Sequence, residues 1–226
     1  MSVKLLFPTP IFERNFLDSN LNPNQGYDES YATQLKNEID AMRRKDPEGR
    51  RISNAYTGWQ SNDGIDRNPL FQKCMNRIST FFHEEVCTYF GVSSKIRMGN
   101  SWANINDKGA WNMPHLHNGC WFSGVLYISA GGDEGDIQFI DPMPKVVGNM
   151  PHGRRSNPSH RIAPSTGNCI LFPSGAMHMV EPNFSKSNRY SISFNVDLVD
   201  YNNKPMPWDE NEFTFKLDEK GDPILS

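Results

Sequence analysis

Two histidines one residue apart stand between a proline and a glycine in "PHLHNG", residues 114–119. The chain has only 6 histidines, and alternate residues of a strand point to the same face of a sheet. His115 and His117 could therefore aim two imidazoles at one metal ion. On spacing alone, two polar residues on a turn are the simpler interpretation. A metal site is favoured only if other parts of the chain supply further ligands.

A second chemical pattern lies in "RYSISFNVDL", residues 189–198, where polar and apolar residues alternate. The polar face could be the solvated outer face that antiparallel sheets commonly have. It could instead line the interior of a barrel, where Arg189 and Ser191 would project together. A guanidinium fork beside a hydroxyl suits a carboxylate. His178 lies shortly before this segment, and the order of His-x-His, a distant histidine and Arg-x-Ser matches a metal site with an adjacent dicarboxylate anchor.

The elements that must position these residues differ between the two parts of the chain. Apolar residues at helical spacing predict helices over 29–45 and 68–91, the second capped by Asn68, started by Pro69 and stopped by Gly91. In the second helix, we expect Phe71, Met75, Ile78, Phe82 and Tyr89 to be buried. From residue 95 onward, turn residues separate short predicted strands, which lie at 95–106, 121–129, 136–140, 168–173 and 189–198.

Helices followed by many short strands predict a mainly β fold with N-terminal helices packed on a β-sandwich or jelly roll. We expect a single domain over 1–226. It comprises a helical support region at about 1–94, a jelly-roll core at about 95–198 and a C-terminal extension at 199–226. The proline-rich connection within 142–166 is long, and its charged residues (Lys145, Arg154, Arg155 and Arg161, with His152 and His160) indicate a solvated loop or a lid that meets substrate.

Composition excludes several functional classes. The net charge is −3 with a pI near 6.1, so nothing predicts binding to nucleic acid or to an anionic membrane. No apolar run is long enough to cross a bilayer, and the first residues lack the apolar core of a signal peptide. The four scattered cysteines contain no C-x-x-C pair, which favours reduced thiols in a cytoplasm.

Six segments taken together resemble the bacterial and phage branch of the 2-oxoglutarate- and Fe(II)-dependent oxygenases, which includes prolyl-hydroxylase-like enzymes. They run from about residue 5 to residue 198, and they are "LFPTPIF", "SWANIN", "HLHNGCWFSGVLYI", "IQFIDP", "GNCILFPSGAMHMV" and "RYSISFNV". The resemblance implies a double-stranded β-helix, a cupin-like jelly roll with iron at its open end. It also implies Fe(II), 2-oxoglutarate and O2, with hydroxylation of an unidentified peptide side chain or small molecule and release of succinate and CO2.

The resemblance also implies residue roles. His115 and His178 match iron ligands, and Arg189 with Ser191 matches the anchor for the far carboxylate of 2-oxoglutarate. Tyr127 and Asn104 match positions that often donate hydrogen bonds to this cosubstrate. Most of the superfamily has Asp or Glu where this chain has His117, but the branch that it resembles also has His-x-His here. We therefore favour His117 as the third ligand over a carboxylate such as Asp136 or Asp141. The aromatic side chains expected to wall a dry pocket are Trp102, Trp111, Trp121 and Phe122.

Three other functions are compatible with these residues. A three-histidine zinc site would activate water for hydration or hydrolysis. A cupin-type dioxygenase would use three histidines on iron without 2-oxoglutarate. A non-enzymatic jelly-roll binding module would carry its histidines incidentally. The first two have no need for Arg189 and Ser191. The sequence predicts a cytoplasmic protein of a bacterial cell or phage-infected host, and it predicts nothing about oligomeric state.

Overall fold

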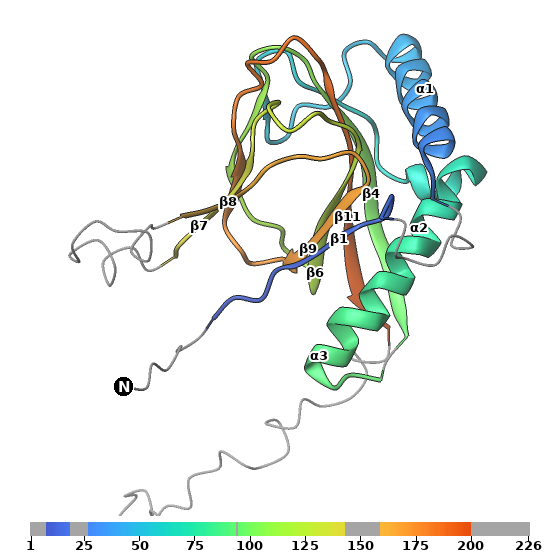
Figure 1. The fold of residues 1–226 in the computed structure, drawn as a ribbon, viewed down its shortest axis with the longest axis vertical. Helices are drawn as coiled ribbons and strands as arrows, with labels where there is room; N and C mark the ends of the chain where they lie inside the picture. Colours follow the sequence, from blue (N-terminus) through green and yellow to red (C-terminus); the bar gives the residue numbers. More distant parts are fainter. Residues whose placement is uncertain (1–7, 19–26, 94, 143–158, 200–226) are drawn as a thin grey trace, which may run out of the picture.

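Two antiparallel sheets face each other in the computed structural model, which describes residues 8–18, 27–93, 95–142 and 159–199 (Figure 1). Sheet A contains β1 (Phe12–Asn15), β3 (Trp59–Gln60), β4 (Ile96–Asn106), β6 (Phe122–Ser129), β9 (Asn168–Pro173) and β11 (Arg189–Leu198). Sheet B contains β2 (Asn54–Ala55), β5 (Trp111–His115), β7 (Ile137–Ile140), β8 (Ser159–Ile162) and β10 (His178–Val180). The strand orders are β1-β9-β6-β11-β4-β3 and β2-β5-β10-β7-β8. This arrangement is the predicted jelly roll.

The two predicted helical segments form as expected. α1 (Glu29–Lys45) begins at Asp28, whose side chain accepts a hydrogen bond from the Tyr31 backbone N–H. α2 (Pro69–Phe81) begins at Asn68, which accepts from the Leu70 backbone N–H, as the sequence predicted. A short 3-10 helix, η2 (Ile65–Arg67), precedes α2. The helical segment continues through a π-helix, η3 (Phe82–Cys87), and α3 (Thr88–Phe90), and it ends at Gly91 in the left-handed conformation.

The π-helix corrects one prediction about the buried face. Phe71, Met75, Ile78 and Phe82 are buried, but Tyr89 is 61% exposed. A π-helical turn contains more residues than an α-helical turn, so it rotates every later side chain relative to the stripe that the earlier ones form. The α-helical spacing used for the prediction therefore fails beyond Phe82.

Alternation along β11 separates two cores. Tyr190, Ile192, Phe194 and Val196 are buried in the large cluster that includes the helices' apolar residues. The intervening residues, beginning with Arg189, point between the two sheets, where a second cluster contains Val125, Tyr127, Ile137, Phe139, Ile170 and Phe172. Since Arg189 and Ser191 are buried, the outer-face interpretation of this strand is wrong for both residues.

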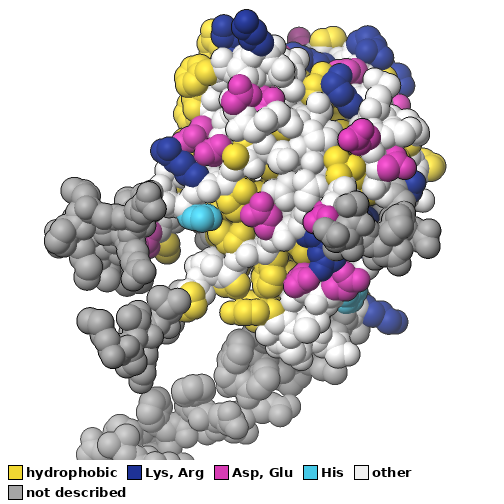
Figure 2. All heavy atoms as spheres, viewed as in Figure 1, with side chains coloured by type: hydrophobic (Ala, Val, Ile, Leu, Met, Phe, Trp, Pro, Cys, Tyr) yellow, Lys and Arg dark blue, Asp and Glu magenta, His cyan; other side chains and the backbone are white. Residues whose placement is uncertain are grey.

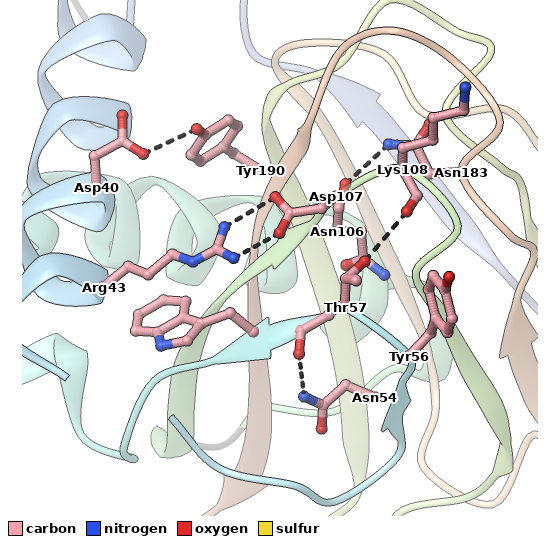
Figure 3. Close-up of polar contacts among 12 residues, drawn as sticks. Asp40, Arg43, Asn54, Tyr56, Thr57, Asn106, Asp107, Lys108, Asn183 and Tyr190 are labelled. Atoms are coloured by element: carbon pink, nitrogen blue, oxygen red, sulfur yellow. Dashed lines mark hydrogen bonds and ion pairs between the residues drawn. The ribbon is translucent and has the colours of Figure 1, made fainter. Parts of the chain in front are cut away.

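Helix α1 is fixed to the end of the barrel by polar contacts as well as by its apolar face (Figure 3). Arg43 donates two hydrogen bonds to the Asp107 carboxylate, at 2.9 and 2.5 Å. One turn earlier, Asp40 accepts a hydrogen bond of 2.8 Å from the Tyr190 hydroxyl on β11. These contacts hold the helical layer on the outside of sheet A, away from the space between the sheets.

Basic and acidic side chains are interspersed on the face shown in Figure 2, in keeping with the small net charge of −3. Within the described part of the chain, no helix has both the length and the apolar character needed to cross a bilayer.

Candidate functional site

Strand pairing in sheet B brings the histidines together. His115 at the end of β5 is the direct partner of His178 at the start of β10. The register then shifts before Val180, which pairs with Asn112. Pro114 lies in this irregular stretch, and bulges are among the strand positions where proline is found. His117 lies just past β5, and its backbone N–H donates to the Ser174 carbonyl at 3.0 Å.

The three imidazoles can share one metal ion. One nitrogen from each of His115, His117 and His178 lies within 4.8 Å of the others, and among the described residues this is the only such group. The ring centroids of His115 and His178 are 4.3 Å apart. Neither Asp136 nor Asp141 belongs to this group. The geometry therefore favours His117 over either carboxylate as the third donor.

Backbone carbonyls orient two of the rings. The Nδ1 of His115 lies 2.6 Å from the Met113 carbonyl oxygen, and the Nδ1 of His178 lies 2.9 Å from the Ala176 carbonyl oxygen. A carbonyl oxygen can only accept, so each Nδ1 carries the proton and donates it. Each Nε2 is then left with a free lone pair, which is the form that binds a metal ion.

Burial keeps these rings neutral. Loss of hydration, with repulsion from the neighbouring imidazole of His115, lowers the pKa of His178 to about 3 and that of His117 to about 4. Burial also lowers the pKa of His115. At neutral pH all three imidazoles are therefore uncharged, and each has a nitrogen lone pair available for a metal ion.

Arg189 is a buried cation without a carboxylate partner in the described part of the chain. Its side chain is 2% exposed, and one terminal nitrogen donates to the carbonyls of Glu134 and Gly135 at 3.2 and 2.6 Å. Its Nε is buried and has no hydrogen-bond partner. An unpaired buried charge is costly, so this guanidinium has the unmet requirement that an anionic ligand would satisfy.

Three neighbouring strands place polar groups beside Arg189. Ser191 on β11 pairs with Asn104 on β4 on one side and with Tyr127 on β6 on the other. Side chains at paired positions share a face, so the amide, the two hydroxyls and the guanidinium all point between the sheets. Burial raises the pKa of Tyr127 to about 12, so its hydroxyl stays protonated and able to donate.

All seven site residues predicted from the sequence line one pocket, together with further side chains that the sequence did not single out. The predicted ones are Asn104, His115, His117, Tyr127, His178, Arg189 and Ser191, and the added polar ones are Ser53, Asn106, Asn112 and Ser193. Asn106 donates to Asn112 and Asn112 to Ser53, at 3.2 and 3.1 Å. Only their position beside the predicted residues, on strands for Asn106, Asn112 and Ser193, could have indicated them.

The expected aromatic wall is only partly present. Trp102 lines the pocket, whereas Trp111, Trp121 and Phe122 are not among its lining residues. Trp121 and Phe122 instead pack against Phe82 and Phe90 on the helical side of sheet A. Alternation along β6 explains this difference, since Phe122 falls on the face opposite Tyr127.

Most of the charged 142–166 connection lies outside the described residues, as do Lys145, His152, Arg154 and Arg155. Its end forms strand β8, which the sequence did not predict. Within β8, Arg161 makes an ion pair with Glu181 at 3.1 Å.

The donor set fits the metal and cosubstrate that the resemblance implies. Three neutral imidazoles suit Fe(II) and leave coordination positions open. The buried guanidinium and its neighbouring hydroxyl suit one carboxylate of a diacid, in the same pocket as the metal ligands.

A family model described as "Putative 2OG-Fe(II) oxygenase" matches residues 100–195. This span contains all seven predicted site residues and most strands of both sheets. No curated protein matches the sequence.

Solved structures with the same fold include several oxygenases. A prolyl-4-hydroxylase from Pseudomonas putida has 14% identity and a TM-score of 0.54, covering 83% of this chain and 92% of its own. A prolyl hydroxylase from Trichoplax adhaerens, in complex with a hypoxia inducible factor peptide fragment, has 12% identity and a TM-score of 0.58, covering 83% of both chains. HygX from Streptomyces hygroscopicus, with nickel, 2-oxoglutarate and hygromycin B bound, has 10% identity and a TM-score of 0.55, covering 84% of both.

Proposed function

We propose that this chain is a 2-oxoglutarate- and Fe(II)-dependent oxygenase that hydroxylates a C–H bond of a peptide side chain or small molecule. The family model over residues 100–195 and the double-stranded β-helix fold support this proposal. His115, His117 and His178 bind the iron. Arg189 and Ser191 bind the far carboxylate of 2-oxoglutarate, and Tyr127 and Asn104 donate further hydrogen bonds to it. Bound iron, with 2-oxoglutarate and O2, supplies the oxidising chemistry and releases succinate and CO2.

The observation that carries this proposal is the position of Arg189. A buried guanidinium with an unpartnered Nε lines the same pocket as three converging imidazoles. The carbonyls of Glu134 and Gly135 hold one end of the guanidinium. The side chain is therefore ordered before any ligand arrives, which reduces the entropy lost on binding.

The remaining residues position reactants and exclude water. Val125, Ile137 and Phe172 give the pocket an apolar wall beside the ligands. The rim near the histidines is also apolar, since Met113 is 43% and Leu116 is 40% exposed. We propose that this rim contacts the substrate.

The solved structures with this fold indicate two broad substrate classes, peptides and small molecules. One of them holds a peptide fragment and another holds hygromycin B, so both peptides and small molecules fit this fold. We place the protein in the cytoplasm of a bacterial cell or phage-infected host, which the four free cysteines support. A zinc hydratase, a cupin-type dioxygenase without 2-oxoglutarate and a binding module are disfavoured because none of them uses Arg189.

Anaerobic addition of Fe(II) and 2-oxoglutarate tests the proposal. A chelated keto acid gives a weak visible charge-transfer band, and we expect this band in the wild-type protein. Arg189→Ala should weaken 2-oxoglutarate binding by at least about 30-fold, because truncating one partner of a buried charge pair costs 2–5 kcal/mol or more. A variant that binds 2-oxoglutarate as tightly as the wild type would disprove the anchor.

The metal ligands are tested separately by Fe(II) binding. We expect His117→Ala to lose most of its iron affinity, and Asp136→Ala and Asp141→Ala to retain theirs. If His117→Ala keeps iron while either aspartate variant loses it, the third ligand is a carboxylate instead.

A further inference from the structure

His117 is held in place differently from the other two histidines, and we infer that Trp102 and Asn195 are positioning residues that keep its imidazole in the metal site. This inference rests on the proposed function, since it takes His117 to be a ligand. It adds two side chains of sheet A to the site, one of which, Asn195, is not among the residues that line the pocket.

Trp102 restricts the rotation of the His117 ring. Its indole is stacked on the imidazole, with ring centroids 5.8 Å apart and planes 18° apart. The His178 ring is also stacked on this imidazole, with centroids 5.3 Å apart and planes 10° apart. The imidazole of His117 is therefore nearly parallel to both neighbouring rings. Trp102 is half-buried on β4, paired with Ser193 of β11, so the sheet fixes its backbone.

Asn195 follows Ser191 and Ser193 in alternation along β11, so its side chain lies on the face that points between the sheets. Its side chain interacts with the imidazole of His117, and its Oδ1 accepts a hydrogen bond of 2.9 Å from the Ser123 hydroxyl on β6. The β4–β11 ladder is irregular here, because Phe194 pairs with Ser101 whereas Val196 pairs with Met98. Asn195 therefore faces two residues of β4, Gly99 and Asn100, so the bulge lies on β4 and leaves Asn195 in the regular alternation of β11.

The other two ligands are oriented by backbone hydrogen bonds. Carbonyls of Met113 and Ala176, each two residues before its histidine, orient the rings of His115 and His178. Side chains are not involved, so no single substitution of a neighbour removes those hydrogen bonds. His117 lies beyond the end of β5, and its ring is oriented by side chains from the opposite sheet.

The residue type explains why orientation matters at this position. A carboxylate carries a negative charge on two oxygens, so a cation attracts it in several orientations. A neutral imidazole binds through one nitrogen whose lone pair must point at the metal. A chain with histidine in place of the usual acid therefore depends more on the groups that hold the ring.

Metal titration of single and combined variants tests the inference. We expect Trp102→Leu and Asn195→Leu each to weaken Co(II) binding about 10- to 100-fold in calorimetry, as loss of ligand-orienting groups does. The visible ligand-field spectrum of bound Co(II) should change with them, which a general loss of stability would not cause. Trp102→Phe, which keeps a flat ring, should restore most of the affinity. Asp197→Asn is the matched control. Asp197 lies two residues after Asn195 on β11, but its side chain accepts a hydrogen bond from Arg97 and has no part in the proposed positioning of His117.

Variants made in a His117→Ala background separate the positioning roles from the ligand set. There, Trp102→Leu and Asn195→Leu should cause no further loss, because they act through the ring that is missing. An equal loss in that background, or single variants with wild-type affinity and spectrum, would overturn the positioning roles while leaving the ligand set intact. If His117→Ala alone binds Co(II) like the wild type, the ligand set itself is wrong.

Discussion

The charges of individual side chains explain why the pocket suits a dianion. Its lining contains one buried cation, Arg189, three histidines held neutral by burial, and no Asp or Glu among the described residues. A divalent metal on three neutral donors keeps its full charge, one unit more positive than with a carboxylate ligand. Two carboxylates of 2-oxoglutarate can then compensate the metal at one end and the guanidinium at the other.

The backbone of Gly135, which has a conformation that favours glycine, holds the Arg189 guanidinium. Its φ is +91°, and an added Cβ would lie 2.2 Å from the Glu181 carbonyl oxygen. Its own carbonyl accepts the 2.6 Å hydrogen bond from Arg189. We expect Gly135→Ala to lower the free energy of unfolding by more than about 1 kcal/mol and to weaken 2-oxoglutarate binding, because the turn must shift. Urea unfolding and a 2-oxoglutarate titration measure the two effects.

Gly91→Ala provides the comparison for this prediction. It also has a positive φ, of +64°, but nothing lies within 4 Å of its added Cβ. It should lose stability and keep its affinity for 2-oxoglutarate. If the two variants bind 2-oxoglutarate equally well, the Gly135 carbonyl does not position Arg189.

Among the secondary-structure elements, those with clear periodicity were predictable. The helix over 29–45 and strands such as 189–198 match the structure closely because each has enough residues to show its period. Strands β2 and β3, with 2 residues each, and β10, with 3 residues, were missed. Such segments have no pattern of their own, and only the strands beside them define them. β10 matters most, because it carries His178.

The candidate site was predictable where its residue types are unusual. Histidines at 115, 117 and 178 and the arginine at 189 are rare enough in their order to suggest a site. The asparagines at 106 and 112 and at 195 are not, since Asn is common in turns and on solvated strands. Their roles depend on which strands are neighbours, which the sequence does not display.

Helix α1 should contribute stability without contributing to the site, since it packs on the outer side of sheet A. Asp28 caps this helix by accepting from Tyr31 at 2.7 Å. Asp28→Ala should lower the free energy of unfolding by about 1 kcal/mol, or about 2–4 °C in Tm. Its affinity for metal and 2-oxoglutarate should equal that of the wild type, measured by calorimetry. A loss of affinity along with stability would mean that the helical layer transmits strain to the site.

At the scale of the whole molecule, the site joins the two sheets. Sheet B supplies His115 and His178, and sheet A supplies Arg189, Ser191, Tyr127 and Asn104. A ligand bound to both groups would connect the sheets across their interior. It would stabilise only the folded state, because the unfolded chain does not bring these residues together.

Thermal unfolding should therefore depend on metal and cosubstrate together. At 100 times its Kd, a ligand that binds only the folded state adds about 2.7 kcal/mol, which corresponds to about 5–10 °C in Tm for a chain of this size. We expect 2-oxoglutarate to give such a shift with Mn(II), and a much smaller one after treatment with a chelator. Glutarate, which has both carboxylates but no keto oxygen to bind the metal, should give less than 2-oxoglutarate. Equal Tm shifts from the two diacids, or a 2-oxoglutarate shift that persists with the chelator, would show that the diacid binds without contacting the metal. The metal site and the diacid site would then be independent of each other.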